Sequence, residues 1–262
     1  MNSFFTGLLF LTRLPIKYDA EWTPEACGKS VKYFALIGAI LGAVNVLAVL
    51  CLCVALPQLF NITIKPSVGA FLLLFVNIAS TGALHCDGYT DTMDGLLSGR
   101  ERNRVLEIMK DSHVGAHGVT SLIVLLLGKY SAIAALYPVT GAPTNSICIL
   151  GIALFLMPVI ARLSMVIGIT LFPYARKEGL GKAFTDYADK SSLVIVFITA
   201  LVLVSAAYVD SYHAVAALVA AIIFAMLFCR HVTAKLGGLT GDVYGAVTEL
   251  SELLVLLIFA LR

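Results

Sequence analysis

The chain has 262 residues, of which 60% are hydrophobic and only 13% are charged, and its formal net charge is +2. A composition this apolar excludes an ordinary soluble globular domain and is typical of a protein that crosses the membrane several times. The near-neutral charge also argues against a nucleic-acid partner. We therefore expect an all-α, polytopic transmembrane helical bundle in which residues 1–262 form a single integral-membrane domain.

The N-terminal segment, residues 1–33, carries four basic residues at positions 13, 17, 29 and 32. It begins with MNSFFTGLLFLTRLPIK, a short apolar stretch that no basic residue precedes and that contains no small-residue cleavage site. This pattern favours an interfacial or re-entrant helix over a cleaved signal peptide. Residues 34–56 follow without a charge, and a run of that length is sufficient to cross the bilayer.

A second span is expected at residues 67–84 and leads into a polar stretch at 81–119. We expect this helix to continue beyond the membrane surface through Asp94, to break at Gly95 and Gly99, and to resume as a short polar helix over 101–109. The remaining spans are expected at 118–137, 145–171, 192–209, 212–229 and 243–261. An uncharged turn at 138–144, a polar loop at 172–191, a tight turn at 210–211 and a glycine-rich loop at 230–242 would connect them.

The basic residues lie mainly on one side of these seven predicted spans. Fourteen of the eighteen fall in segments on the side of the N-terminus, two fall on the other side, and Lys129 and Arg162 fall within spans. The positive-inside rule therefore predicts a cytoplasmic N-terminus and a multi-pass protein of the cell inner (plasma) membrane. The polar stretch at 81–119 would then face the cytoplasm.

Four of the nine aspartates lie in that polar stretch: Asp87, Asp91, Asp94 and Asp111. On a helix the first three recur at i, i+4 and i+7, so they share one side and repel each other. A divalent cation would relieve the repulsion, and ligands made only of oxygen favour Mg²⁺, Ca²⁺ or Mn²⁺ over zinc. We expect all four aspartates to act at one metal site, with Asp91, Asp94 and Asp111 also catalytic. The alternative is a solvated acidic helix end.

Basic residues follow the aspartates closely and suit a negatively charged substrate such as a pyrophosphate. We assign this role to Arg100, Arg104, Lys110 and Arg176; alternatively, these cations set the topology and contact lipid headgroups. Three further polar positions are candidates. We expect Lys129, in mid-span, to contact a substrate phosphate or a carboxylate, and its partners would include Glu249 or Glu252.

Two candidates carry hydrogen-bonding side chains. Asp242 follows a glycine and is either a site carboxylate or the cap of the last helix. His85 directly precedes the acidic motif, and hydrogen bonding to substrate or backbone suits an imidazole there better than ligation of a hard cation.

The stretch HCDGYTDTMDGLLSGRERNRVLEIMKDSHVGAHG at 85–118 resembles the signature of the cobalamin synthase family, the adenosylcobinamide-GDP ribazoletransferases. Weaker segments agree in order: FLTRLP at 10–15, Arg162, YARKEGLGKAF at 174–184 and GGLTGDVYGAVTELSE at 237–252. The departures are Cys86 and Tyr89 at positions where apolar residues are expected, and His113 where an arginine is expected. The last departure puts in doubt a phosphate role at that one position.

The resemblance implies a Mg²⁺-dependent membrane enzyme of late cobalamin biosynthesis. The enzyme would be embedded in the lipid bilayer. It would join adenosylcobinamide-GDP to α-ribazole or its 5′-phosphate and release GMP. A homo-oligomer, or association with other late enzymes of the pathway, is compatible with that role. Two other functions remain open: a phosphotransferase of the CDP-alcohol type that makes phospholipid, and a cation-coupled transporter. A transporter favours carboxylates near the bilayer midplane, whereas these aspartates follow the end of a predicted span.

Overall fold

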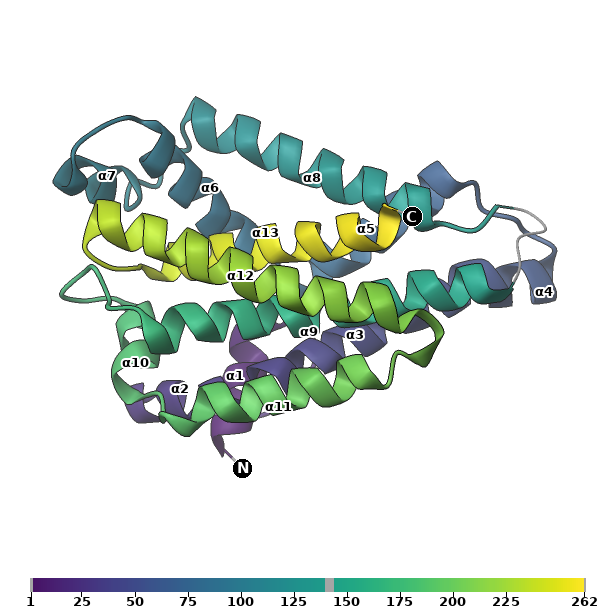
Figure 1. The fold of residues 1–262 in the computed structure, drawn as a ribbon, viewed down its shortest axis with the longest axis horizontal. Coiled ribbons are helices and arrows are strands. Elements are labelled where there is room, and N and C mark those ends of the chain that lie inside the picture. Colours follow the sequence, from purple (N-terminus) through teal and green to yellow (C-terminus); the bar gives the residue numbers. More distant parts are fainter. Residues whose placement is uncertain (1, 140–143, 262) are drawn as a thin grey trace.

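The computed structural model describes residues 2–139 and 144–261, and within these ranges the chain is helical apart from short connections. Most of the longer helices run along the same direction and form one elongated bundle (Figure 1). Helices satisfy every backbone hydrogen bond within one segment, which is what a chain surrounded by lipid needs. The predicted all-α membrane bundle is confirmed.

The bundle begins with α1 (Asn2–Leu11), which at ten residues is too short to span a bilayer as a helix. A second helical stretch runs without interruption from Pro24 to Phe60, over 37 residues. It comprises α2 (Pro24–Ser30), a 3₁₀ turn, α3 (Phe34–Leu50), a π turn at Cys51–Ala55 and α4 (Leu56–Phe60). Thr23 starts it, because the Thr23 hydroxyl accepts a hydrogen bond from the amide of Ala26.

The expected continuous helix from the second span into the acidic stretch is wrong. Helix α5 (Pro66–Thr81) ends at Gly82, and α6 (Leu84–Leu97) leaves at 90° to it. Gly82 and Ala83 both have positive φ angles, of 63° and 58°, which reverse the chain direction sharply. The Arg13 side chain packs against Gly82, where a Cβ would lie 2.6 Å from it, and the amides of Gly82 and Ala83 donate back to the carbonyls of Ala79 and Ile78.

Three other expected boundaries shift. Helix α6 continues through Gly95, and the chain turns at Gly99 instead, before α7 (Arg102–Ile108). The polar loop contains α10 (Leu180–Tyr187), which is bent by 93° from α11 (Ser191–Ser205). Helix α12 (Ser211–Leu236) extends seven residues past its expected end, because its polar last turns carry no helix breaker before Gly237.

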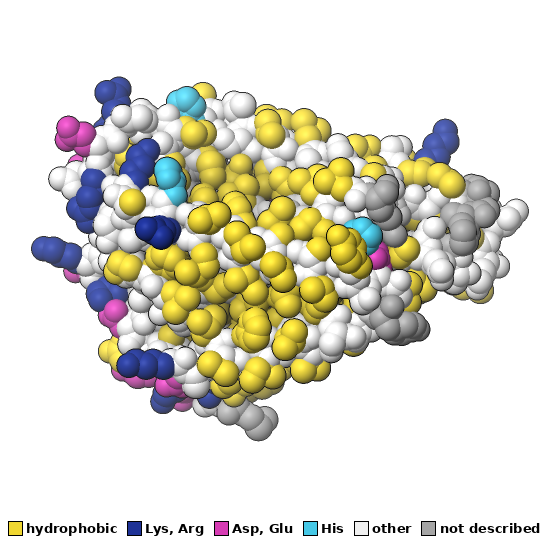
Figure 2. Space-filling view, viewed as in Figure 1, with side chains coloured by type: hydrophobic (Ala, Val, Ile, Leu, Met, Phe, Trp, Pro, Cys, Tyr) yellow, Lys and Arg dark blue, Asp and Glu magenta, His cyan; other side chains and the backbone are white. Residues whose placement is uncertain are grey.

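Within residues 2–139 and 144–261, five helical segments are long and apolar enough to cross a membrane, and the number rises to seven if each bent pair counts as one span. They include α8 (Ala116–Leu136), α9 (Thr144–Leu171), α12 and α13 (Gly241–Ala260). Figure 2 shows apolar side chains over the middle of the bundle and most charged side chains gathered at one end. That end contains α7 and the loop that follows α9 (Figure 1).

Helices α9 and α13 form the centre of the bundle and are buried along most of their length. Helix α13 packs on α9, α12, α8 and α6. Its crossing with α6 is close because Gly245 faces Gly88, and a Cβ on Gly245 would lie 3.3 Å from the Gly88 Cα. Small residues let helix backbones approach in this way in membrane proteins. The crossing brings the acidic helix α6 against the first turn of the last helix.

Candidate active site

The close crossing of α6 and α13 brings carboxylates from distant parts of the sequence together. A Cβ on Gly88 would lie 2.9 Å from the carbonyl oxygen of Asp242, so the backbones touch at the start of α13. Asp91 is half-buried, and the charges that act on it most strongly are those of Asp242, Asp87 and Asp94. Asp87 and Asp91 of α6 thus lie near a carboxylate that the sequence places about 150 residues later.

Asp94 has a different environment from its neighbours on α6. It is buried, and its two carboxylate oxygens accept hydrogen bonds from the amides of Gly115 and Gly118, each at 2.7 Å. These amides belong to the first turn of α8, where unpaired N–H groups need acceptors. A Cβ on either glycine would approach the Asp94 carboxylate within 2.5 Å, so both positions require glycine. Asp94 therefore caps α8 and fixes it beside α6.

Asp111 lies apart, in the exposed connection between α7 and α8. Its carboxylate accepts hydrogen bonds from the backbone N–H and the imidazole of His113, and these bonds hold the pKa of Asp111 below its ordinary value. The other charged group that acts on it most strongly is Arg104. The structure thus brings Asp87 and Asp91 together with Asp242, while Asp94 binds the start of α8 and Asp111 has its own partners.

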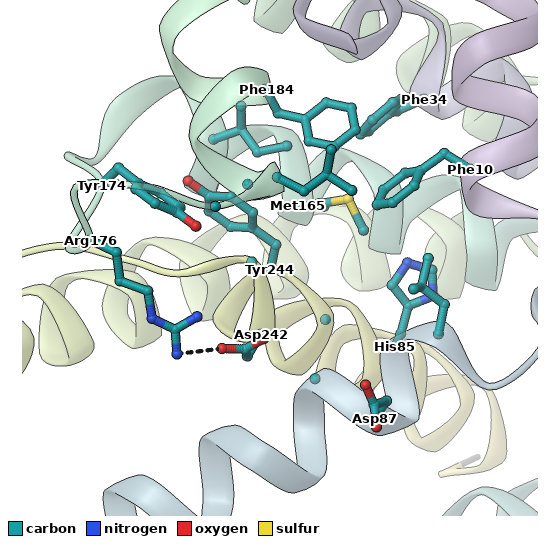
Figure 3. Close-up of a pocket in the computed structure, with 18 residues that line it drawn as sticks. Phe10, Phe34, His85, Asp87, Met165, Tyr174, Arg176, Phe184, Asp242 and Tyr244 are labelled. Atoms are coloured by element: carbon teal, nitrogen blue, oxygen red, sulfur yellow. Dashed lines mark ion pairs between the residues drawn. The ribbon is translucent and has the colours of Figure 1, made fainter. Parts of the chain in front are cut away.

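Arg176 faces this carboxylate group from the loop between α9 and α10. Residues 173–175 of the loop pair with Leu239: the Ala175 amide donates to the Leu239 carbonyl at 2.7 Å, and the Leu239 amide donates to that of Pro173 at 2.8 Å. The guanidinium of Arg176 then forms an ion pair with Asp242 at 2.9 Å (Figure 3). The cap of α13 is supplied by Thr240, whose hydroxyl accepts from the Val243 amide, so Asp242 is not the cap.

The other predicted phosphate ligands lie nearer the surface. Arg104 is exposed and pairs with Glu107 at 2.8 Å, and Arg100 is also exposed. Lys110 lines an open surface cavity of about 490 Å³ together with Arg176. Arg102 and Lys177, which the sequence interpretation did not single out, line the same cavity.

A second cavity, of about 230 Å³, lies on the inner side of Arg176. Its polar wall includes Asp87, Arg176 and Asp242, and its opposite wall is formed by aromatic and aliphatic side chains (Figure 3). These are Phe10, Phe34, Leu84, Met165, Ile169 and Phe184. His85 also lines the cavity; it is only 3% exposed, and within the described residues neither of its ring nitrogens has a hydrogen-bond partner.

Lys129 has carboxylate partners deep in the bundle. Its ammonium group pairs with Glu249 at 2.5 Å and with Glu252 at 2.7 Å, and Arg162 contacts Glu252 at 3.3 Å. All four side chains are buried, and two positive charges balance two negative ones. Lys129 does not line either cavity beside Arg176, so its contacts within the described residues are those of a buried ion network.

The carboxylates suit a magnesium ion whose coordination the substrate completes. Within residues 2–139 and 144–261, no three His, Cys, Asp or Glu side chains lie close enough to hold a metal by themselves. Mg²⁺ is commonly bound by one or two carboxylates, with water and substrate phosphates as the other ligands. Asp87, Asp91 and Asp242 offer carboxylate oxygens of this kind beside the guanidinium of Arg176.

Comparison with known proteins identifies the family. The family model described as cobalamin-5-phosphate synthase matches residues 3–260. The chain belongs to the cobalamin-5-phosphate synthase family. An adenosylcobinamide-GDP ribazoletransferase of Desulfitobacterium hafniense is 40% identical over 98% of this chain and 96% of its own length. Proteins of the same name from Brevibacillus brevis (36% identity; 98% of this chain, 97% of the relative) and Pseudomonas paraeruginosa (37%; 100% and 98%) are also similar. No solved structure matches the chain.

Part of this synthase-family site escaped the sequence interpretation. Tyr174, Phe184 and Tyr244 lie in segments that resemble the family, yet nothing in their spacing indicates a shared cavity. Phe10 and Phe34 belong to apolar helices, where a phenylalanine carries no functional signal. Their roles become visible only when α1, α3, α10 and α13 pack around α6.

Proposed function

We propose that this chain joins adenosylcobinamide-GDP to α-ribazole, or to its 5′-phosphate, and releases GMP. Family membership across residues 3–260 and the names of the relatives support this reaction. The observation that carries the proposal is the meeting of Asp87, Asp91 and Asp242 with Arg176 beside one cavity. Carboxylates next to a guanidinium are the groups that displacement at a nucleotide diphosphate uses.

The transfer forms one phosphorus–oxygen bond and breaks another. A ribose hydroxyl of α-ribazole attacks the phosphorus that bears the aminopropanol arm of the corrinoid, and the bridging oxygen leaves with GMP. Asp91 takes the hydroxyl proton in this proposal, since no ion pair or helix cap among the described residues engages its carboxylate. Arg176 stabilises the negative charge on the phosphate oxygens.

Mg²⁺ belongs to the same proposal. Asp87 and Asp242 would hold it with the substrate phosphates, which leaves Asp91 free to take the proton, and Asp94 would keep α8 in position behind them. The bound ion would neutralise charge that builds up on the diphosphate during transfer. Participation of Asp111 in the same site stays a prediction, and it requires the connection before α8 to move towards α6 when substrate binds.

The nucleotide diphosphate would enter from the charged end of the bundle. Lys110 and Arg176 line the outer cavity, and Arg104 lies beside it through its partner Glu107. Arg176→Lys removes the planar, paired donors that suit a phosphate, so we expect the KM for adenosylcobinamide-GDP to rise by about tenfold. Neutral substitutions of Arg100 and Arg104 should act in the same way. If the substitutions lower only the amount of inserted protein and leave the activity per molecule normal, the two arginines determine the membrane topology instead.

The charged end would face the cytoplasm of the cell inner membrane, where soluble nucleotide substrates are present. The asymmetry of basic residues supports this orientation. Cysteines introduced at Thr63 and at Ser98, in the chain lacking its own cysteines, should separate the two sides in intact cells. An impermeant thiol reagent should label Thr63→Cys and spare Ser98→Cys. Labelling of Ser98→Cys from outside would overturn the orientation.

The reaction itself is tested with purified protein in liposomes. Adenosylcobinamide-GDP, α-ribazole and Mg²⁺ should yield GMP and the joined cobalamin in equal amounts, and chelation of the metal should stop both products. A parallel assay with CDP-diacylglycerol and a small alcohol should yield no CMP. CMP release without GMP release would favour the phospholipid-forming alternative and refute the proposal.

A further inference from the structure

We propose that the inner cavity binds the base of α-ribazole, with the ribose directed towards Asp87 and Asp242. This inference rests on the proposed function and assigns one substrate to one part of the site. The cavity measures about 230 Å³ and is bounded by α1, α3, α6, α9, α10 and α13. It is formed largely by helices that the sequence interpretation did not connect with the site.

The size of the cavity selects among the groups that the reaction brings together. An apolar cavity of about 150 Å³ takes a benzene ring, so a cavity half as large again suits a bicyclic aromatic base. A corrin macrocycle with its amide side chains is several times larger and cannot enter. The corrinoid must therefore stay outside, with only its phosphorylated arm reaching Arg176.

The chemistry of the walls distinguishes the two remaining bases. Phe10, Phe34 and Phe184 provide an aromatic wall, and Met165 provides a polarisable one (Figure 3). A dimethylbenzimidazole base is apolar apart from one free ring nitrogen. Guanine carries donors and acceptors along its edge, and the side chains of Phe10, Phe34 and Phe184 would leave them unpaired, which is unfavourable in a buried site. The walls therefore favour the ribazole base.

His85 supplies the matching polar contact. Its imidazole is buried, it lines the cavity, and within the described residues both ring nitrogens lack a partner. A neutral imidazole has one N–H donor, and the free ring nitrogen of the base would accept a hydrogen bond from it. Across the cavity from the three phenylalanines, Asp242 and Asp87 offer acceptors for ribose hydroxyls (Figure 3). The cavity thus has one apolar half, which suits the base of the nucleoside, and one half with carboxylates, which suits the ribose hydroxyls.

Filling the cavity tests the assignment. Ile169→Phe adds volume to the wall that α9 contributes, and Ile152→Phe makes the same change on α9 in a separate apolar cavity at the other end of the helix. We expect Ile169→Phe to raise the KM for α-ribazole by about tenfold or more and to leave that for adenosylcobinamide-GDP within about twofold. Ile152→Phe should change neither. If Ile169→Phe raises the KM for adenosylcobinamide-GDP alone, or changes the KM for neither substrate, the assignment is overturned.

Substrate analogues test the same assignment on the unaltered protein, so it stays decidable if Ile169→Phe fails to fold. The nucleosides of benzimidazole and dimethylbenzimidazole should be used, whereas those of adenine and naphthimidazole should lose about tenfold or more in kcat/KM, the first by polarity and the second by size. Equal use of all four refutes the base site while leaving the transferase function intact. Absence of GMP release with every nucleoside refutes the proposed function instead.

His85 has its own readout. His85→Gln keeps an N–H donor and should raise the KM for α-ribazole less than His85→Phe does, with kcat changed less than KM in both variants. If both variants lower kcat equally without raising that KM, His85 does not contact the base.

Discussion

Replacement of Lys129 by methionine tests whether the buried ion network holds the bundle together. In the wild type two cations balance Glu249 and Glu252, and the Lys129 side chain is 2% exposed. Methionine keeps most of the volume and removes the charge, so two carboxylates are left facing Arg162 alone. Removing one partner from a buried pair costs about 3–5 kcal/mol, because a charge remains without compensation. We expect a loss of that size for Lys129→Met.

The measurement is reversible unfolding in mixed micelles, followed by circular dichroism as the mole fraction of SDS rises. The double variant Lys129→Met/Glu249→Gln restores charge balance through Arg162 and Glu252, and should regain at least about half of the lost stability. The matched control is Lys182→Met. Lys182 pairs with Asp186 across one helical turn, with side chains 37% and 44% exposed, so its loss should cost under about 0.5 kcal/mol.

Two outcomes would refute the reasoning. A Lys129→Met protein within about 1 kcal/mol of the wild type would mean that the network does not stabilise the fold. A double variant no more stable than the single one would mean that charge balance is not the cause. If Lys129 bound a substrate phosphate instead, the single variant would unfold normally and show a raised KM.

Three further predictions concern the crossing of α6 and α13. Asp87→Asn and Asp91→Asn should lower turnover about a hundredfold at saturating Mg²⁺ without changing stability, and wild-type rates in both would contradict the shared site. Asp94→Asn should also lower the unfolding free energy by about 1–3 kcal/mol, because its NH₂ group would face an N–H donor of α8; unchanged stability in the SDS titration would rule out the cap. Gly88→Ala should abolish GMP release by separating the helices, whereas Gly151→Ala, which has open space around it, should be silent in the same assay.

The sequence was sufficient to predict features that depend on local spacing. The i, i+4, i+7 pattern placed Asp87, Asp91 and Asp94 on one helix, and the runs of apolar residues located the helices that are long enough to cross a membrane. The carboxylate partners of Lys129 were also foreseeable, since a buried ammonium needs them and Glu249 and Glu252 lie in another apolar helix.

Features that depend on tertiary contacts were not predictable. At the reversal, Gly82 packs against Arg13, which is far away in the sequence, and the backbone of Ala83 adopts a conformation that alanine seldom takes. The approach of Arg176 to Asp242 depends on pairing of two irregular segments around Leu239. No periodicity in either segment indicates that pairing.

The inner cavity contains Phe10 from the first helix and Tyr244 from the last, so its walls come from opposite ends of the chain. Membrane helices are synthesised from the N-terminus, and contacts between residues distant in sequence form late because the intervening chain must first be ordered. While the ribosome is still adding α12, the acidic helix α6 has no partner across its glycine face. Docking of α13 therefore completes the candidate site, and a chain that ends before Gly241 lacks the wall of the cavity that α13 supplies and the carboxylate opposite Asp91.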